Sequence, residues 1–328
     1  MPPSNISLWL RFAQQQMAAE SYLHDIDITS PTQVADALVR GNNRQGFPEG
    51  GFTRLVQTQA DQFTQRYQIV DHHANDATGF SATLMKDTTT GEYTLSFRST
   101  EFRDQSEGGD YERDGVFAAP LTFAADGEVG AKGFAFGQLV AMENYYLQLT
   151  SSGVLPTGAT LNVTGYSLGG HLATVFTELH ANDPEIVFGQ TYTFNGAGRG
   201  HITGPGATEA ARIDGMLDLV REVLFNPDAG LGVINDPLNP RYQAAAALAG
   251  QPFTPFTSES VLGQAGNLYT DVRYQWAVEV ATTVYSTSLL QTSPGEIGTS
   301  PAFGKITQLY GQATTGDLTF VANSGVHA

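Results

Sequence analysis

Residues 159–181 constrain the fold of this chain more than any other stretch. The apolar run ATLNV is typical of a buried strand, TGYSLGG follows it at once, and HLATVFTELHA then has the pattern of a helix. A second strand-like segment, QTYTFNGAG, comes shortly after this helix. A strand, a helix and another strand in this order predict a parallel sheet with crossover helices. The chain is therefore expected to be an α/β protein.

The rest of the chain shows the same two periodicities. Helices are predicted at residues 5–23, 31–40, 52–66 and 130–151, and strands at 67–73, 79–87, 91–99, 266–274 and 318–322. The second helix has Ser30 as its N-cap and Gly41 as its stop. Residues 199–265 interrupt the pattern with two helical segments around a Gly/Pro/Asn-rich loop. They predict a cap-like insertion within a single domain that spans residues 1–328.

Composition excludes several classes of partner. The 328 residues carry a net charge of -17 and no basic run, which argues against nucleic acid or an anionic membrane held by charge. Cysteine is absent, so disulfides and thiolate metal sites are excluded. No run of 18 apolar residues predicts a transmembrane helix, and the first residues lack the basic and apolar regions of a cleavable signal.

Ser167 is the candidate nucleophile. It lies in a Gly-x-Ser-x-Gly motif, which is weak alone, but here the motif joins a predicted strand to a predicted helix. Gly165 and Gly169 would let the backbone close tightly while Ser167 projects from the end of the strand. The N–H groups at the start of the helix would face developing negative charge. The alternative is a glycine-rich packing turn.

The quoted motifs resemble the class 3 lipase family, whose nucleophile stands in G-x-S-L-G-G. GEYTLSFRST, residues 91–100, is similar to the family strand that ends in Phe-Arg-Gly-Thr/Ser, and GFAFGQLVAMENYYLQL is similar to the helix before the nucleophile strand. The resemblance covers about residues 67–200 well. It is nearest to the lipase modules of secreted bacterial proteins with calcium-binding repeats. It implies an α/β-hydrolase fold with a mostly parallel sheet and helices on both faces.

The resemblance also implies an oxyanion hole. Thr100 matches the residue that donates its backbone N–H, and the N–H of Leu168 would be the second donor. Two positions depart from the family: Tyr166 replaces the usual histidine before the nucleophile, and Ser99 stands where the family has glycine. Arg98 is expected to pair with a carboxylate beneath the site.

A serine nucleophile needs a histidine base and an aspartate, in the chain order Ser, Asp, His. His171 is expected to pack under the turn and His180 to cap its helix. Between Ser167 and His201 the only aspartate is Asp183, which lies in a segment typical of a turn. His327, behind the strand LTFVA, is the expected base, although it is the penultimate residue. We therefore expect the natural protein to continue beyond residue 328.

Asp271 is the expected acid, because it ends the predicted strand GNLYTDVRY in an Asn-x-x-x-Asp pattern similar to that of the family. The competing aspartates lie in segments typical of turns: Asp228, Asp236 and Asp317.

These features predict a serine carboxylic ester hydrolase, foremost a triacylglycerol lipase acting through an acyl-enzyme on an ester or lipid substrate. Phospholipase A1, a broad carboxylesterase, and an inactive hydrolase fold used for binding or secretion are the alternatives. No cofactor or metal is expected; calcium at residues 104–115 is conceivable, but their spacing fits no calcium-loop template. Residues 199–265 would supply an acyl-binding cap. The resemblance implies secretion without a cleavable signal, with a cytoplasmic location as the alternative.

Overall fold

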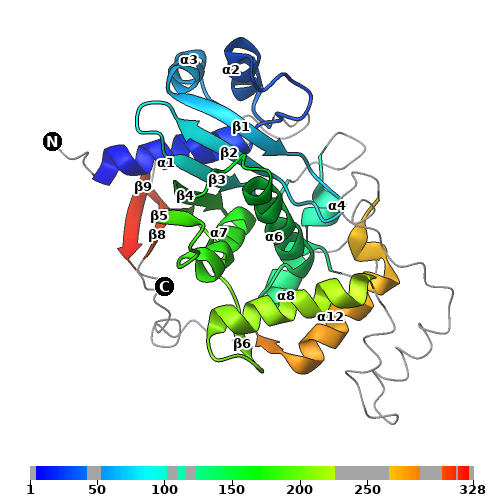
Figure 1. The fold of residues 1–328 in the computed structure, drawn as a ribbon. Coiled ribbons are helices and arrows are strands. Elements are labelled where there is room, and N and C mark those ends of the chain that lie inside the picture. Colours follow the sequence, from blue (N-terminus) through cyan, green and yellow to red (C-terminus); the bar gives the residue numbers. More distant parts are fainter. Residues whose placement is uncertain are drawn as a thin grey trace, which may run out of the picture.

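A seven-stranded mixed sheet lies at the centre of the fold (Figure 1), in the order β1-β2-β3-β4-β5-β8-β9. The computed structural model describes residues 5–42, 53–101, 109–115, 123–225, 266–288, 305–314 and 317–324. The strands of the sheet are β1 Tyr67–His73, β2 Ala82–Asp87, β3 Tyr93–Phe97, β4 Ala159–Tyr166, β5 Ile186–Phe194, β8 Ile306–Thr314 and β9 Asp317–Ser324. A separate two-stranded ribbon pairs β6 His201–Thr203 with β7 Ser286–Ser288.

The four central strands are parallel. β3 pairs with β4, β4 with β5, and β5 with β8 in parallel, whereas β1–β2, β2–β3 and β8–β9 are antiparallel. The α/β class expected from the sequence is therefore confirmed. In the register, Phe97 lies opposite Gly165, and Tyr166 lies opposite Phe194. The chain segments that follow β3, β4 and β5 thus leave the sheet at one common edge.

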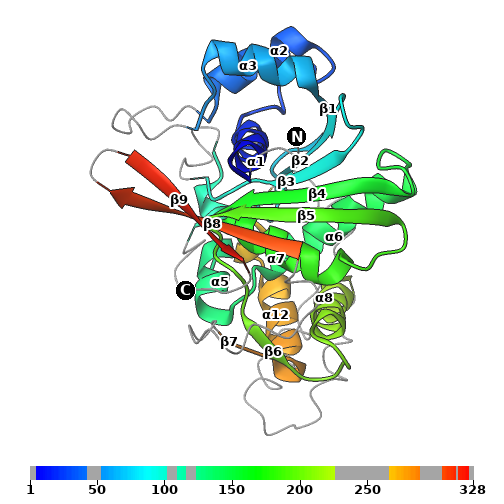
Figure 2. The same ribbon diagram turned by 90° about the vertical axis from the view of Figure 1, so that its left-hand side faces the viewer.

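Helices cover both faces of the sheet (Figure 2). One face carries α1 Asn5–Ala19, α2 Pro31–Arg40 and α3 Gln57–Arg66. The other carries α6 Phe136–Ser151 and α7 Leu168–His180, with α8 Glu209–Phe225 and α12 Val272–Val284 beyond them. The short helices are α4 Tyr111–Asp114, α5 Ala125–Lys132 and the 3₁₀ turn η2 Leu268–Thr270. Among the residues described, no helix combines the length and the apolar character needed to cross a membrane.

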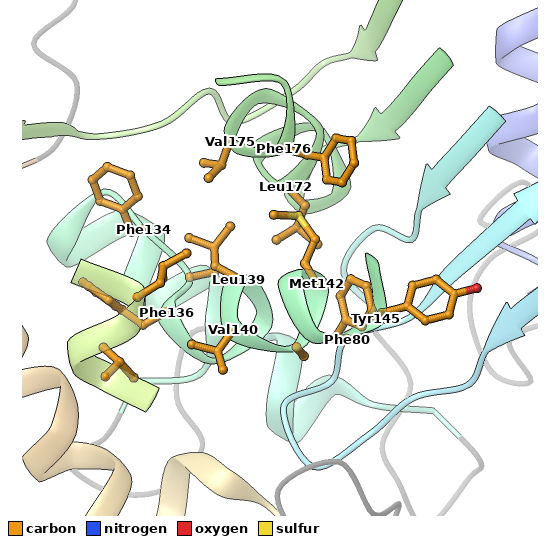
Figure 3. Packing of buried hydrophobic residues seen from close by; sticks show 14 of the residues in the cluster. Phe80, Phe134, Phe136, Leu139, Val140, Met142, Tyr145, Leu172, Val175 and Phe176 are labelled. Carbon is orange, nitrogen blue, oxygen red and sulfur yellow. The ribbon is translucent and has the colours of Figure 1, made fainter. Parts of the chain in front are cut away.

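The main hydrophobic core lies between the sheet and the layer of α6 and α7. Figure 3 shows apolar side chains of these two helices meeting, with Leu139 and Met142 of α6 facing Leu172 and Phe176 of α7. A second core lies under α2 and α3 on the opposite face. Burial of an apolar side chain of this size stabilises a fold by about 1.5–3 kcal/mol. The two cores therefore fix the sheet from both sides.

Several local predictions are confirmed. Helix α2 begins after Ser30, whose side chain accepts a hydrogen bond from the N–H of Gln33, and ends at Gly41 with φ 60°. Strand β1 has the predicted bounds, and β2 and β3 form the predicted hairpin. The single helix predicted over 130–151 is instead two helices. α5 ends at Gly133, whose φ of 82° belongs to the left-handed region that favours glycine.

The strand predicted at residues 266–274 is wrong. These residues form η2 and the start of α12. Asn267 caps the 3₁₀ turn by accepting a hydrogen bond from the N–H of Tyr269, and Asp271 caps α12 by accepting one from the N–H of Arg273. Both residues are good N-caps, and packing of α12 against α8 overrides the β propensity of its aromatic and branched residues.

Only the first part of the predicted insertion falls within the described residues. Helix α8 buries apolar side chains against α6, α7 and α12: Ile213, Met216, Leu217, Val220, Val223 and Leu224. These side chains belong to the main core, so they are not exposed surface for a lipid chain. Residues 226–265, with the second predicted helix and the PFTPF segment, lie outside the described residues, as do Asp228 and Asp236.

Candidate active site

The backbone of Ser167 is held in a rare conformation. Ser167 has φ 51° and ψ −116° at the junction of β4 and α7, where left-handed backbone is unusual for a residue with a side chain. Its N–H donates to the carbonyl of Phe194 at 3.1 Å, and its own carbonyl accepts from the N–H of Ala197 at 3.1 Å. Strained residues of this kind persist where the surroundings determine them, and they gather at active sites. The side chain is partly exposed and makes no capping bond.

The glycines around Ser167 are required by close backbone contacts. A Cβ atom at Gly165 would overlap the carbonyl of Gly169, and one at Gly169 would overlap the carbonyl of Phe97. A Cβ atom at Gly170 would lie 2.5 Å from the Cα of Gly196. The first turn of α7 therefore presses directly on the carboxyl end of β3, which places the loop after β3 beside the serine.

That loop has an unusual pattern of backbone hydrogen bonds. The N–H of Ser99 donates to Glu20 Oε1 at 3.0 Å, and the N–H of Glu101 donates to Asp114 Oδ2 at 2.8 Å. The N–H of Thr100, between them, has no acceptor among the described residues. The N–H of Leu168, in the first turn of α7, has none there either. These two donors belong to the segment after β3 and to the start of α7, which lie in contact at Gly169.

The side chain of Thr100 is engaged elsewhere. Its hydroxyl donates to Asp126 Oδ2 of α5 at 2.8 Å. Burial raises the pKa of Asp126 to about 6, and this effect outweighs the hydrogen bond from Thr100, which lowers the pKa. Since a hydroxyl has one hydrogen to donate, the donor of Thr100 without an acceptor among the described residues is its backbone N–H.

Arg98 lies in the buried position expected of it. Its Nη2 atom is 2.7 Å from Glu101 Oε1, and its guanidinium stacks over the ring of Tyr22 at 4.7 Å from the centroid. Both charged side chains are buried. Arg98 therefore supports the loop from within the protein and does not face solvent.

His171 is fully buried and both of its ring nitrogens are bonded. Nδ1 lies 2.6 Å from the carbonyl of Gly198, and Nε2 accepts from the N–H of Ala135 at 3.2 Å. Burial lowers the pKa of His171 to about 4, so the ring stays neutral. It links α7 to the segments after β5 and before α6, which is the packing role that its position in the sequence indicates.

The other two histidines that follow Ser167 within the described residues pair with carboxylates. His180 lies 3.1 Å from Glu143 and 3.3 Å from Asp183. Burial would lower the pKa of His180, but these carboxylates outweigh it and raise the pKa to about 9. His201 is exposed on β6, with Nδ1 3.9 Å from Glu209 Oε1.

The predicted acid and base are not brought together within the described residues. Asp271 Oδ1 accepts hydrogen bonds from the N–H of Arg273 at 2.8 Å and from Arg273 Nε at 2.9 Å. His327 lies outside the described residues. Strand β9 runs antiparallel to β8, and its last residue, Ser324, is level with Thr307 and hence with Thr164 of β4. A base at position 327 therefore requires the chain to turn back toward Ser167 after β9.

No group of three or more His, Asp or Glu side chains forms a metal-binding arrangement within the described part of the chain. Part of the acidic stretch 104–115 falls outside it. Sequence reasoning missed Glu20 and Asp126, which hold the residues around Thr100. Both act across long sequence separations, and no local motif marks them.

Comparisons with known proteins give no match: no protein-family model fits the chain, and no curated protein is similar to it in sequence. The resemblance to class 3 lipases therefore stays a prediction.

Proposed function

We propose that this chain is a serine carboxylic ester hydrolase of the α/β-hydrolase type, and foremost a triacylglycerol lipase. The observation that carries the proposal is the left-handed backbone of Ser167 at the turn between a parallel strand and a helix. In an α/β-hydrolase this conformation projects the hydroxyl from the carboxyl edge of the sheet. The N–H groups of Thr100 and Leu168, which have no acceptor among the described residues, belong to the two segments that follow β3 and β4 there. A glycine-rich packing turn does not explain the strained backbone of the serine.

The reaction follows from these groups. The Ser167 oxygen attacks the ester carbonyl carbon, and its proton passes to a histidine base. The carbonyl oxygen becomes an oxyanion, which accepts hydrogen bonds from the N–H groups of Thr100 and Leu168. Collapse of the tetrahedral intermediate expels the alcohol, which takes the proton from the histidine and leaves an acyl-enzyme. Water, activated by the same base, releases the carboxylic acid and restores the hydroxyl.

His327 and Asp271 complete the proposed triad. Replacing Asp271 by Asn tests the acid, because Asn caps a helix about as well as Asp and the start of α12 should be preserved. We expect the thermal unfolding midpoint to stay near that of the wild type. We expect kcat to fall by about 10²-fold or more, because the aspartate charge holds the histidine in the correct tautomer and stabilises its protonated form. A wild-type kcat for Asp271→Asn would leave this residue as the cap of α12 alone.

Thr100→Ala tests the oxyanion loop. The substitution keeps the backbone N–H but removes the bond to Asp126 Oδ2 at 2.8 Å, so the N–H loses part of its support. We expect kcat to fall by roughly tenfold with a smaller change in KM, because the N–H acts mainly in the transition state. Asp126→Asn is the matched variant, since the amide oxygen still accepts from the Thr100 hydroxyl, and it should lose less. An unchanged kcat in Thr100→Ala would show that the threonine side chain is not needed.

A substrate panel tests the lipase assignment. Initial rates on triacylglycerols of increasing acyl length are compared with rates on p-nitrophenyl esters and on phosphatidylglycerol vesicles. The net charge of -17 opposes approach to an anionic interface, so neutral glycerides should be preferred. Faster release of fatty acid from the phospholipid would replace the lipase assignment by phospholipase A1, and activity on short soluble esters alone would replace it by a carboxylesterase.

A further inference from the structure

The N-terminal helix contacts the loop of Thr100 through one buried carboxylate. Glu20, the residue after α1, accepts two hydrogen bonds from Ser99: one from its N–H to Oε1 at 3.0 Å and one from its hydroxyl to Oε2 at 2.7 Å. Glu20 is 3% exposed and Ser99 is 8% exposed. The two residues are 79 positions apart in the chain. The contact is therefore a tertiary link between helix α1 and the segment after β3.

Glu20 is itself held in place from β3. Gln16, one helical turn earlier, donates from Nε2 to Glu20 Oε1 at 2.8 Å and to the carbonyl of Phe97 at 2.9 Å. Its Oε1 accepts from the hydroxyl of Ser96 at 2.8 Å. The hydrogen bonds thus run from the end of β3 through Gln16 and Glu20 to Ser99, and all of these side chains are buried.

Packing alone does not account for this arrangement. Burial raises the pKa of Glu20, while the charge of Arg98 and the hydrogen bonds from Ser99 and Gln16 act in the opposite direction. A buried charge costs free energy that an apolar side chain of similar volume avoids, and buried polar networks serve in some proteins to select one conformation. The serine at position 99 supplies two of the bonds that offset this cost.

The bonds at Ser99 lie directly before the N–H of Thr100. The N–H of Ser99 anchors the peptide that joins it to Arg98, and its hydroxyl anchors its side chain. After Thr100, the N–H of Glu101 donates to Asp114 Oδ2 at 2.8 Å. The N–H of Thr100 lies between these two anchored groups. We propose that Glu20 is a positioning residue which, through Ser99, holds the N–H of Thr100 in the orientation that an oxyanion requires. This role rests on the proposed hydrolase function.

Four variants test the proposal by kcat and KM on p-nitrophenyl butyrate and by thermal unfolding. Glu20→Ala removes both bonds, and we expect kcat to fall by roughly 10- to 100-fold with KM within about threefold, because a displaced donor mainly affects the transition state. Ser99→Ala keeps the N–H bond and should lose about fivefold in kcat by the same reasoning. Glu20→Gln keeps an acceptor oxygen and should return kcat to within about threefold of the wild type.

Ser21→Ala is the matched control, because Ser21 is also buried just after α1, and within the described residues its hydroxyl donates to the carbonyl of Met17 of that helix at 3.4 Å. Its kcat should equal that of the wild type. A merely structural link would lower the unfolding midpoint of Glu20→Ala and leave kcat unchanged, which overturns the proposal. If Glu20→Ala does not fold, a wild-type kcat in Ser99→Ala overturns it equally. Ester turnover that persists in Ser167→Ala would remove Ser167 as the nucleophile of the proposed function, and the positioning role with it.

Discussion

Replacing Ser167 by alanine is expected to lower kcat/KM for p-nitrophenyl butyrate by about 10³-fold or more, because deletion of a nucleophile removes the covalent route altogether. The fold should survive the change. Ser167 already carries a Cβ atom at φ 51°, so alanine adds no backbone strain there, and the hydroxyl makes no capping bond at the start of α7. The measurement is initial-rate kinetics on purified wild-type and variant protein.

Gly169→Ala is the control for damage to the turn. Its Cβ atom would meet the carbonyl of Phe97 and come within 2.7 Å of the carbonyl of Arg98, so this variant should lose stability as well as activity. Ser167→Ala should instead keep the wild-type unfolding midpoint to within a few degrees. If Ser167→Ala retains a tenth or more of the wild-type kcat/KM, Ser167 is not the nucleophile.

Replacing His327 by alanine is expected to reduce kcat nearly as far as Ser167→Ala, by about 10³-fold or more, because the members of a catalytic triad act as a unit. A base at this position must reach Ser167 from the end of β9, which is separated from β4 by the two strands β5 and β8. Adjacent strands lie about 4.8 Å apart, so residues 325–327 must cross toward the serine. The measurement is kcat for the same ester across pH 5–9. The wild type should lose activity as the pH falls, because the histidine base becomes protonated and can no longer accept the serine proton.

His201→Ala is the comparison that decides the base. His201 is exposed on β6, which follows the turn after β5, and it lies 3.9 Å from Glu209. If His327 is the base, His201→Ala should stay within about threefold of the wild type, as a surface substitution outside the machinery does. An inactive His201→Ala together with an active His327→Ala would assign the base to His201 and its orienting carboxylate to Glu209.

The fold could be predicted where local signals and tertiary packing agree. Residues 159–194 have the predicted strand, glycine turn, helix and strand, although β5 begins and ends four residues before the predicted segment 190–198. Prediction failed at residues 266–274, where aromatic and branched side chains favour a strand in isolation but α12 packs against α8. The caps Asn267 and Asp271 were a readable signal for the helix.

The site could be predicted only in its local part. Ser167, Gly165 and Gly169 belong to one short motif, so their geometry follows from adjacent residues. The supports of Thr100 could not be found this way. Asp126 is 26 residues away in sequence, and Glu20 is 79 residues from Ser99, so only the folded chain brings them to the loop. The serine at position 99 departs from the glycine of the family pattern, and its hydroxyl is bound by Glu20.

Covalent labelling tests the nucleophile most directly. The protein is incubated with an organophosphonate ester, and the product is examined by intact mass and by peptide mapping. A serine activated by a base and facing an oxyanion site reacts with such a reagent, whereas an ordinary serine hydroxyl does not. We predict one adduct per chain, on the peptide that contains Ser167, with parallel loss of ester hydrolysis and no labelling of Ser167→Ala. Unmodified Ser167, or equal labelling of the alanine variant, would contradict the assignment.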